Sequence, residues 1–154
     1  MRINSPRFGT IDVDEERIVT FRDGLLGFRD FKRYYLHEPS EQAALKWMQC
    51  VDMPALGFVV ADPLVFKPDY RVAVAASQLE GLDIDDPRKS QVLVILTVPD
   101  DPAKMTANLQ GPLVINPVNR LGAQLVLNEE GVTTKYPVLE GLRSLRRSGS
   151  NQAV

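Results

Sequence analysis

The sequence predicts an all-β fold, mostly antiparallel, in the form of a small β-barrel-like domain with at most one short helix. Eleven prolines among 154 residues leave little room for long helices. Turn-forming residues recur roughly every 8 to 12 residues, and short β-branched or aromatic runs lie between them. Many short strands at even spacing are typical of an antiparallel sandwich or barrel.

Each expected strand is bounded by such turn residues. The expected strands are, in order, Gly9–Val13, Arg17–Phe21, Arg33–His37, Leu45–Val51, Gly57–Ala61, Tyr70–Ala75, Gln91–Val98, Leu113–Asn116, Leu121–Leu127 and Val132–Lys135. The run Gln91–Val98 is almost continuously apolar, which predicts a central strand covered on both faces. The Ala-rich segment Val74–Leu82 is as compatible with a short helix as with extended chain.

Residues 116–120 are expected to form a hairpin turn between two of these strands. The run Leu121–Leu127 alternates between apolar and other residues, which predicts a strand with one face in the core and the other near water. Asn119 is well suited to a positive φ, because asparagine tolerates the left-handed region better than most residues.

The outward face of this hairpin is a candidate interface. If Leu113 and Ile115 face the core, Val114 and Val126 point outward beside Gln124. An apolar patch rimmed by amides suits a protein interface, because amides pair with a partner's backbone without the desolvation cost of a charge. The alternative, given equal weight, is that another strand covers these outward residues.

The composition predicts one domain over residues 1–137, followed by a flexible or weakly ordered tail over residues 138–154. Apolar residues make up 44% and charged residues 25% of the chain, which is close to the globular average. The formal net charge is −2, and residues 1–137 alone carry 15 basic and 19 acidic side chains. Because a nucleic-acid interface needs clustered Lys and Arg, we expect no direct nucleic-acid binding. An acidic body could attract a basic protein partner, although most acidic surfaces only keep a protein soluble.

The N-terminus and the single cysteine indicate a compartment. No apolar core of the signal-peptide kind follows the first basic residues, and no run approaches the length of a membrane span. We therefore expect a cytoplasmic protein that makes no membrane contact. Cys50 is the only cysteine, so it forms no internal disulfide and is expected to be a small residue within a strand.

No group of residues indicates catalysis. His37 is the only histidine, and no strained serine turn presents a nucleophile to it. The acidic run Asp83–Asp86 resembles the opening of a calcium loop, but Arg88 stands where that loop needs glycine. Gly24 and Gly27 lack the Lys-Ser/Thr ending of a phosphate-binding loop and indicate a turn. We expect no enzyme, no metal and no cofactor; an enzyme would need a role for His37 or the acidic run.

Several segments, in this order and spacing, resemble one family. They are Phe21–Phe28 (FRDGLLGF), Gln49 with Asp52 after Trp47, Phe58–Pro63 leading to Phe66–Tyr70, Val94–Thr97, and Thr106–Asn116 (TANLQGPLVIN) with Gln124. Together they resemble the FliW-type flagellar assembly factors from about Phe8 to Pro137. The sequence departs from the family pattern at Leu26 and Gly111, where proline and alanine are usual, and at Ala44-Leu45, where Pro-Phe is common.

The resemblance implies a β-barrel-like protein without enzymatic activity that binds flagellin and the RNA-binding translational repressor CsrA. In this family's scheme, the bound repressor cannot hold flagellin messenger RNA. Accumulating flagellin takes the factor away, and the freed repressor shuts down flagellin synthesis. The acidic balance of residues 1–137 suits a repressor that binds RNA through basic strands.

Partner contacts are expected in the hairpin region, with a group of carboxylates as further contacts. The expected contact residues are Asn108, Val114, Asn116, Asn119, Gln124, Val126, Asp83, Asp85 and Asp86. We expect the unbound chain to be a monomer. The alternative to this function is a small β-barrel module that binds a small ligand or another protein partner.

Overall fold

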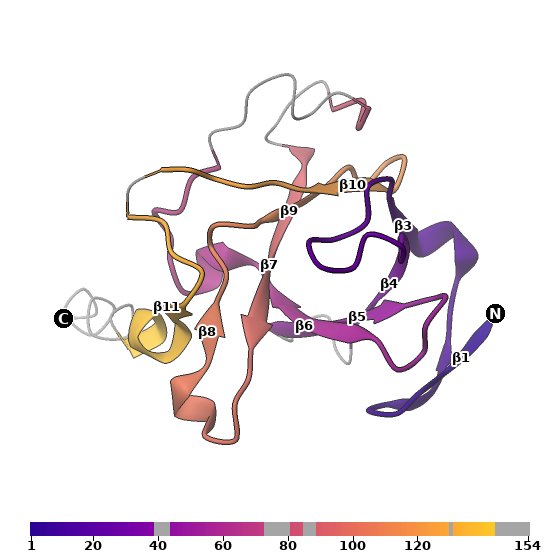
Figure 1. Cartoon of the computed structure of the whole chain (residues 1–154), viewed down its shortest axis with the longest axis horizontal. Helices are drawn as coiled ribbons and strands as arrows, with labels where there is room; N and C mark the ends of the chain where they lie inside the picture. The colour runs from indigo at the N-terminus through magenta and orange to yellow at the C-terminus, as the bar shows by residue number, and fades with distance from the viewer. Residues whose placement is uncertain (39–43, 73–80, 85–88, 130, 144–154) are drawn as a thin grey trace, which may run out of the picture.

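Eleven short strands carry the fold in the computed structural model, which describes residues 1–38, 44–72, 81–84, 89–129 and 131–143 (Figure 1). The strands are β1 (Arg2–Ser5), β2 (Gly9–Asp12), β3 (Ile18–Phe21), β4 (Arg33–His37), β5 (Leu45–Cys50), β6 (Gly57–Ala61), β7 (Gln91–Thr97), β8 (Thr106–Ala107), β9 (Leu113–Ile115), β10 (Leu121–Gln124) and β11 (Tyr136–Pro137). Short 3-10 turns lie in the connections: η1 (Glu15–Arg17), η2 (Pro63–Val65) and η5 (Pro102–Lys104).

Seven of these strands close into a barrel. Hydrogen-bonded neighbours follow the order β7-β6-β5-β4-β3-β10-β9, and β9 pairs again with β7 to close the ring. The pairs are antiparallel except for β3 and β10, which run parallel with Leu121 opposite Thr20. β8 extends the sheet beyond β7, and β11 pairs with β8. The predicted class, a mostly antiparallel all-β barrel, is confirmed.

Large apolar side chains fill the barrel interior, because alternate residues of each strand point inward. The interior cluster consists of Val19, Phe21, Leu25, Tyr34, Leu36, Met48, Cys50, Val60, Leu93, Leu113 and Ile115. On β7, Val94 and Leu96 belong instead to a second cluster that includes Phe66 and Leu109. β7 is therefore covered on both faces, as its continuous apolar sequence predicts.

The β3–β4 connection closes one end of the barrel (Figure 1). Gly24 has a φ of +67°, and its N–H donates to the carbonyl of Phe21, so the chain reverses directly after β3. A Cβ added at Gly24 would lie 2.6 Å from backbone atoms of Arg29. Leu25 points into the interior cluster and is 2% exposed. The glycine turn therefore places an apolar side chain across the barrel opening.

The β1–β2 hairpin covers part of the outside of the barrel. Ile3, Ile11 and Val13 from this N-terminal segment pack against Tyr35 and Val51. Since successive side chains of a strand face opposite sides, Tyr35 of β4 faces this outer cluster while its neighbours point inward.

The β5–β6 turn is held together by one buried amide. Gln49 is 0% exposed, and its side-chain Nε2 donates to the carbonyls of Pro54 and Leu56 at 2.9 and 3.2 Å. Its Oε1 accepts from the indole Nε1–H of Trp47 at 2.9 Å. The Trp47 ring occupies space left by Gly57, where an added Cβ would lie 2.1 Å from Trp47 Cζ2.

Strand bounds agree with prediction where turn residues flank a regular run. Arg33–His37 and Gly57–Ala61 have the predicted bounds. The two-residue strands β8 and β11 and the N-terminal β1 are additional to the prediction.

Two predicted strands do not form within the described residues. Tyr70 ends a tight turn in which its N–H donates to the carbonyl of Lys67, and residues 73–75 lie outside the described part of the chain. The predicted strand Val132–Lys135 is absent: the N–H of Val132 donates to the carbonyl of Glu129, and Gly131 has a φ of +83°.

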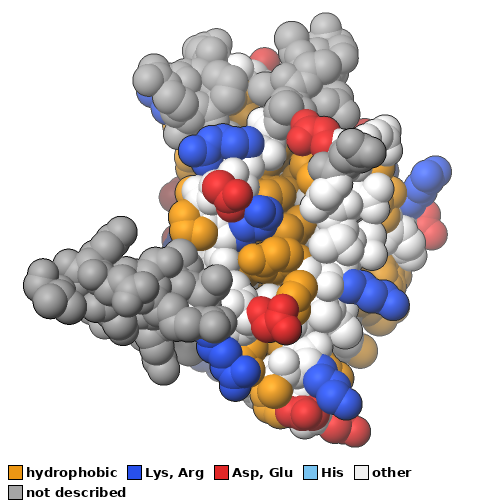
Figure 2. All heavy atoms as spheres, turned by 90° about the vertical axis from the view of Figure 1, so that its left-hand side faces the viewer, with side chains coloured by type: hydrophobic (Ala, Val, Ile, Leu, Met, Phe, Trp, Pro, Cys, Tyr) orange, Lys and Arg blue, Asp and Glu red, His pale blue; other side chains and the backbone are white. Residues whose placement is uncertain are grey.

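Residues 138–143 form a helical segment beside β11. Val138 is 1% exposed and belongs to the second cluster. The candidate helix at Val74–Leu82 lies mostly outside the described residues, and Gly81 and Leu82 form a turn. On the side of the molecule that carries β11 and this segment, a strip of hydrophobic side chains runs between basic and acidic ones (Figure 2).

Candidate functional site

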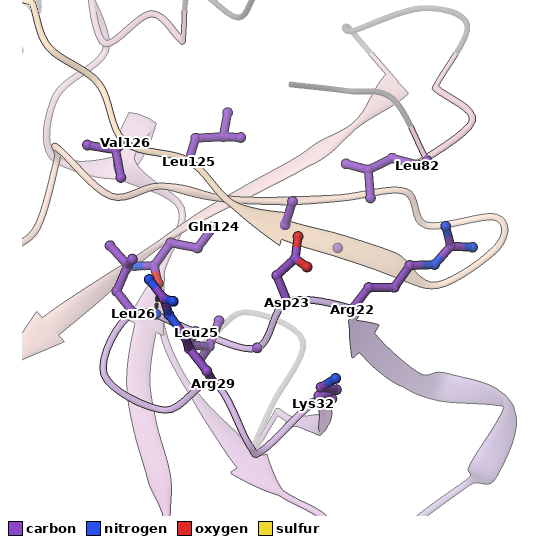
Figure 3. Close-up of a pocket in the computed structure, with 14 residues that line it drawn as sticks. Arg22, Asp23, Leu25, Leu26, Arg29, Lys32, Leu82, Gln124, Leu125 and Val126 are labelled. Atoms are coloured by element: carbon purple, nitrogen blue, oxygen red, sulfur yellow. Dashed lines mark hydrogen bonds between the residues drawn. The ribbon is translucent and has the colours of Figure 1, made fainter. Parts of the chain in front are cut away.

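A groove of about 810 Å³ lies between the β3–β4 connection and β10 (Figure 3). Residues 22–26, Arg29 and Lys32 form one wall, residues 122–126 form the other, and Gly81 and Leu82 border it. We call this depression the β3–β10 groove. The two walls are adjacent because β3 and β10 are neighbouring strands of the barrel.

Gln124 joins the two walls of the groove. Its Oε1 accepts from the backbone N–H of Leu26 at 2.7 Å, and its Nε2 donates to the carbonyl of Gly111 at 3.0 Å. Both ends of the amide are therefore used within the protein. The side chain, which the sequence predicts to contact a partner, fixes the position of Leu26 relative to the hairpin.

The rim of the groove combines exposed apolar and charged side chains. Leu26 is 51% exposed and Val126 is 45% exposed. In Figure 3, Arg29 lies beside Leu26 at one end of the groove and Arg22 lies at the other end. Asp23 lies between the two arginines. Exposed apolar residues rimmed by polar and charged groups are typical of a surface that meets another protein.

Two amides of the β9–β10 hairpin hold the backbone at Leu82. Asn116 Nδ2 donates to the Leu82 carbonyl at 2.8 Å, and Asn119 Nδ2 donates to the same carbonyl at 3.0 Å. Their Oδ1 atoms accept from the N–H groups of Val118 and Leu121, which closes the hairpin turn. We call Asn116 and Asn119 the amide clamp.

The clamp explains the environment of Val114. Val114 is 2% exposed and packs against Leu82 and Leu125. The alternative in which outward residues of the hairpin are covered therefore holds for Val114, although the cover is a turn and not a strand. Val126 stays open to solvent, so the outward apolar patch consists of Val126 and Leu26.

The positive φ in the hairpin belongs to Arg120, at +61°, and the prediction for Asn119 is wrong. Asn119 accepts the N–H of Leu121 through its side chain, and the next residue makes the reversal. The Arg120 guanidinium donates to the carbonyl of Arg17 at 2.7 Å. Burial, and secondarily the charge of Arg17, lower the pKa of Arg120.

Asn108 and Asp83, the described predicted residues outside the hairpin, are not part of the groove lining. Asn108 Oδ1 accepts from the N–H groups of Gln110 and Gly111, each at 3.0 Å, and thereby shapes the turn before β9. Asp83 is exposed, has a φ of +54°, and borders a separate depression of about 460 Å³. Asp85 and Asp86 lie outside the described residues.

The sequence prediction missed the charged wall of the groove. Arg22, Arg29 and Lys32 surround a turn that the two glycines mark, and the sequence gives no further sign of their role. The hydrogen bond that sets this turn against Gln124 joins residues 98 positions apart. The only available signal was that the same segment carries part of the family resemblance.

His37 has aromatic neighbours. Its ring lies 5.1 Å from that of Phe8, which in turn lies 5.5 Å from Trp47. The Arg7 guanidinium sits 5.1 Å from the Trp47 ring. These contacts pack the β1–β2 turn on the barrel.

Within the described residues, no helix is long and apolar enough to cross a membrane.

Known proteins share both the sequence and the fold. The family described as FliW protein matches residues 2–138. A flagellar assembly factor FliW of Alkaliphilus metalliredigens is 39% identical over 153 residues, which cover 99% of this chain and 94% of that protein. One from Leptospira interrogans is 38% identical over 141 residues, which cover 91% and 94%.

A solved structure agrees with these sequence matches. The crystal structure of a flagellar assembly factor FliW aligns with a TM-score of 0.83 at 36% identity, covering 90% of this chain and 96% of that one. The resemblance seen in the sequence is thereby confirmed. The chain belongs to the FliW family of flagellar assembly factors, which is not by name a family of enzymes.

Proposed function

We propose that this chain binds flagellin and a CsrA-type translational repressor in the cytoplasm and couples flagellin synthesis to flagellin level. Family membership supports this proposal, because flagellar assembly factors act on other proteins. The acidic balance of residues 1–137 supports it further, since negative charge favours encounter with a basic RNA-binding protein.

The main observation in support of a binding function is the exposed apolar rim of the β3–β10 groove. Leu26 and Val126 are both about half exposed, and the Gln124 hydrogen bond holds the Leu26 backbone in place. A preformed apolar rim loses little conformational entropy when it binds, which raises affinity. Of the other predicted contacts, Asn119 and Asp83 are exposed and remain part of the proposal.

Titration calorimetry tests the function with purified chain, flagellin and CsrA. Each partner is expected to bind the wild-type chain at micromolar concentration or better. Absence of a complex with both would overturn the proposal. Size-exclusion chromatography of the chain alone tests the expected monomer, and native mass spectrometry tests the small-ligand alternative, which requires a retained ligand.

A matched pair of variants tests the surface. Val126→Asp places a charge on the groove rim and is expected to weaken at least one partner by about tenfold or more, because it replaces an apolar contact with a carboxylate that must lose its hydration when the partner binds. Val98→Asp is the control, since Val98 is 41% exposed and follows β7, away from the groove. Equal affinities of the two variants would remove the groove rim from the interface.

A further inference from the structure

The charged groups of the β3–β10 groove are unbalanced. Arg22, Arg29 and Lys32 are exposed, and among the described residues of the lining Asp23 is the only carboxylate. We infer that the groove binds an acidic segment of a partner protein, with partner carboxylates against these three cations and an apolar partner side chain on Leu26 and Val126. This inference rests on the proposed function in that it assumes a protein partner.

Within the described residues, the three cations share one groove and have no ion-pair partner, in contrast to four of the basic residues elsewhere on the surface. Arg2, Arg33, Lys46 and Lys67 each form an ion pair with a neighbouring carboxylate. Among the residues that the structure describes, Arg22, Arg29 and Lys32 form no such pair. The net charge of the chain is −2, so these three side chains form a local excess of positive charge that is exposed to solvent in the groove. An arriving carboxylate would displace no ion pair that the described residues form.

The positions of the cations define the shape of the ligand. Arg22 lies at the end where Leu82 borders the groove, and a Cβ added at Gly81 would lie 3.3 Å from its Nη1. Arg29 lies at the other end beside Leu26 and Gln124 (Figure 3). Charges at both ends of one groove favour a segment that carries carboxylates along its length over a single small anion. Guanidinium groups bind carboxylates in a bidentate manner, which adds orientation to attraction.

The apolar part of the groove provides the anchor. Leu82 and Leu125 form a buried base, at 4% exposure each, and Leu26 and Val126 stand exposed beside it. A ligand that carries charges alone would leave the Leu26 and Val126 side chains exposed to water. The combination selects an amphipathic acidic segment, because burial of its apolar residue contributes affinity while the cations guide encounter and fix the register.

An RNA backbone is the competing ligand for a cationic groove. Single-stranded RNA binding also relies on aromatic side chains that stack on bases, and no aromatic residue lines this groove in the described part of the chain. Asp23 lies between the cations, where it would repel a continuous row of phosphates but leaves room for spaced carboxylates. The observations therefore favour the acidic protein segment.

Fluorescence anisotropy tests the inference with three labelled probes. The probes are a short amphipathic peptide of Glu and Leu, the same peptide with Gln in place of Glu, and an oligouridine of similar length. We expect the Glu peptide to bind best and its affinity to fall with added salt. Equal binding of the Gln peptide, or tighter binding of the oligouridine, would overturn the inference.

Charge reversal locates the binding. Arg22→Glu with Arg29→Glu is expected to weaken the Glu peptide by about tenfold or more and to flatten its salt dependence. Lys104→Glu in η5, an exposed cation outside the groove, is the control and is expected to change neither. Because these side chains are exposed, the folded state should persist, and circular dichroism checks it. An unchanged affinity in the double variant would overturn the inference.

The natural partners separate this inference from the proposed function. If the wild-type chain binds flagellin or CsrA and the double variant binds equally, the function stands and the acidic-segment inference fails. If the wild-type chain binds neither partner but takes the Glu peptide in the groove, the proposed function fails and the chemistry of the groove stands.

Discussion

Gly57 and Trp47 lie diagonally across the β5–β6 pair, and the indole fills the space that the glycine leaves. The Trp47 ring is also held by its hydrogen bond to Gln49, which in turn closes the β5–β6 turn. A single missing Cβ thus determines where one aromatic ring, one buried amide and one turn lie. Sequence alone marks Gly57 only as the start of a strand.

Gly57→Ala is expected to lower the free energy of unfolding by about 1–3 kcal/mol, because the new Cβ forces the Trp47 ring out of place. Urea unfolding measures the change. Trp47 is the only tryptophan, so a shift of its emission reports the displaced ring directly. In a Trp47→Leu background the same substitution should have a smaller effect. An equal effect in both backgrounds would show that steric conflict with Trp47 is not the cause.

Gln124 is a second residue whose role is internal. Gln124→Ala is expected to lower the free energy of unfolding by about 1–2 kcal/mol, because the Leu26 N–H and the Gly111 carbonyl both lose a partner. Amide hydrogen exchange at Leu26 should become faster. Gln124→Glu keeps the acceptor for Leu26 and should preserve slow exchange there. Unaltered exchange in the Ala variant would mean that the turn is held by other contacts.

At the scale of elements, the amide clamp connects the hairpin to the turn at residues 81–83, which takes part in no strand pairing among the described residues. Asn116 and Asn119 converge on one carbonyl, and Leu82 thereby covers Val114 and Leu125. The hairpin itself was predictable from its alternating pattern and its Asn-rich turn. Its cover was not, because the contact joins residues 34 positions apart and depends on one backbone oxygen.

Asn116→Asp is expected to destabilise the fold by about 1–3 kcal/mol at neutral pH, because a carboxylate then faces the Leu82 carbonyl in place of a donor. The protonated acid restores a donor, so the folded state raises the pKa of the new side chain. The deficit should therefore shrink as pH falls through that raised pKa toward about 4, the unfolded value. Unfolding in urea across this range measures it. A pH-independent deficit would exclude this mechanism.

Across the whole molecule, the strands that could be predicted from the sequence are those with a regular hydrophobic periodicity and flanking turn residues. β4, β6 and the two-faced burial of β7 follow from local patterns. β8 and β11 are only two residues long, which is too short to show the alternation of apolar and polar residues that marks a strand. The groove could not be predicted because its walls come from segments about a hundred positions apart. No short sequence pattern in either segment indicates that β3 and β10 are neighbours.

The buried phenol of Tyr70 is expected to make the stability of the whole fold depend on pH in the alkaline range. Burial raises the pKa of Tyr70 to about 12, and its hydroxyl donates to the Leu109 carbonyl. A raised folded pKa stabilises the protein below the unfolded value of about 10, and this contribution is lost as pH rises through 12. The free energy of unfolding should therefore fall between about pH 10 and 12. Tyr70→Phe should show a shallower fall; an equally steep fall would assign the loss to other groups.

The parallel pairing of β3 with β10 also bears on how the chain acquires its shape. Thr20 and Leu121 meet only after about a hundred intervening residues exist, so the barrel cannot close on a ribosome until β10 has emerged. Until then β3 presents an unpaired edge, which is a site for aggregation. Nascent chains that stop before Leu121 should therefore remain protease-sensitive, and longer ones should gain resistance in a single step.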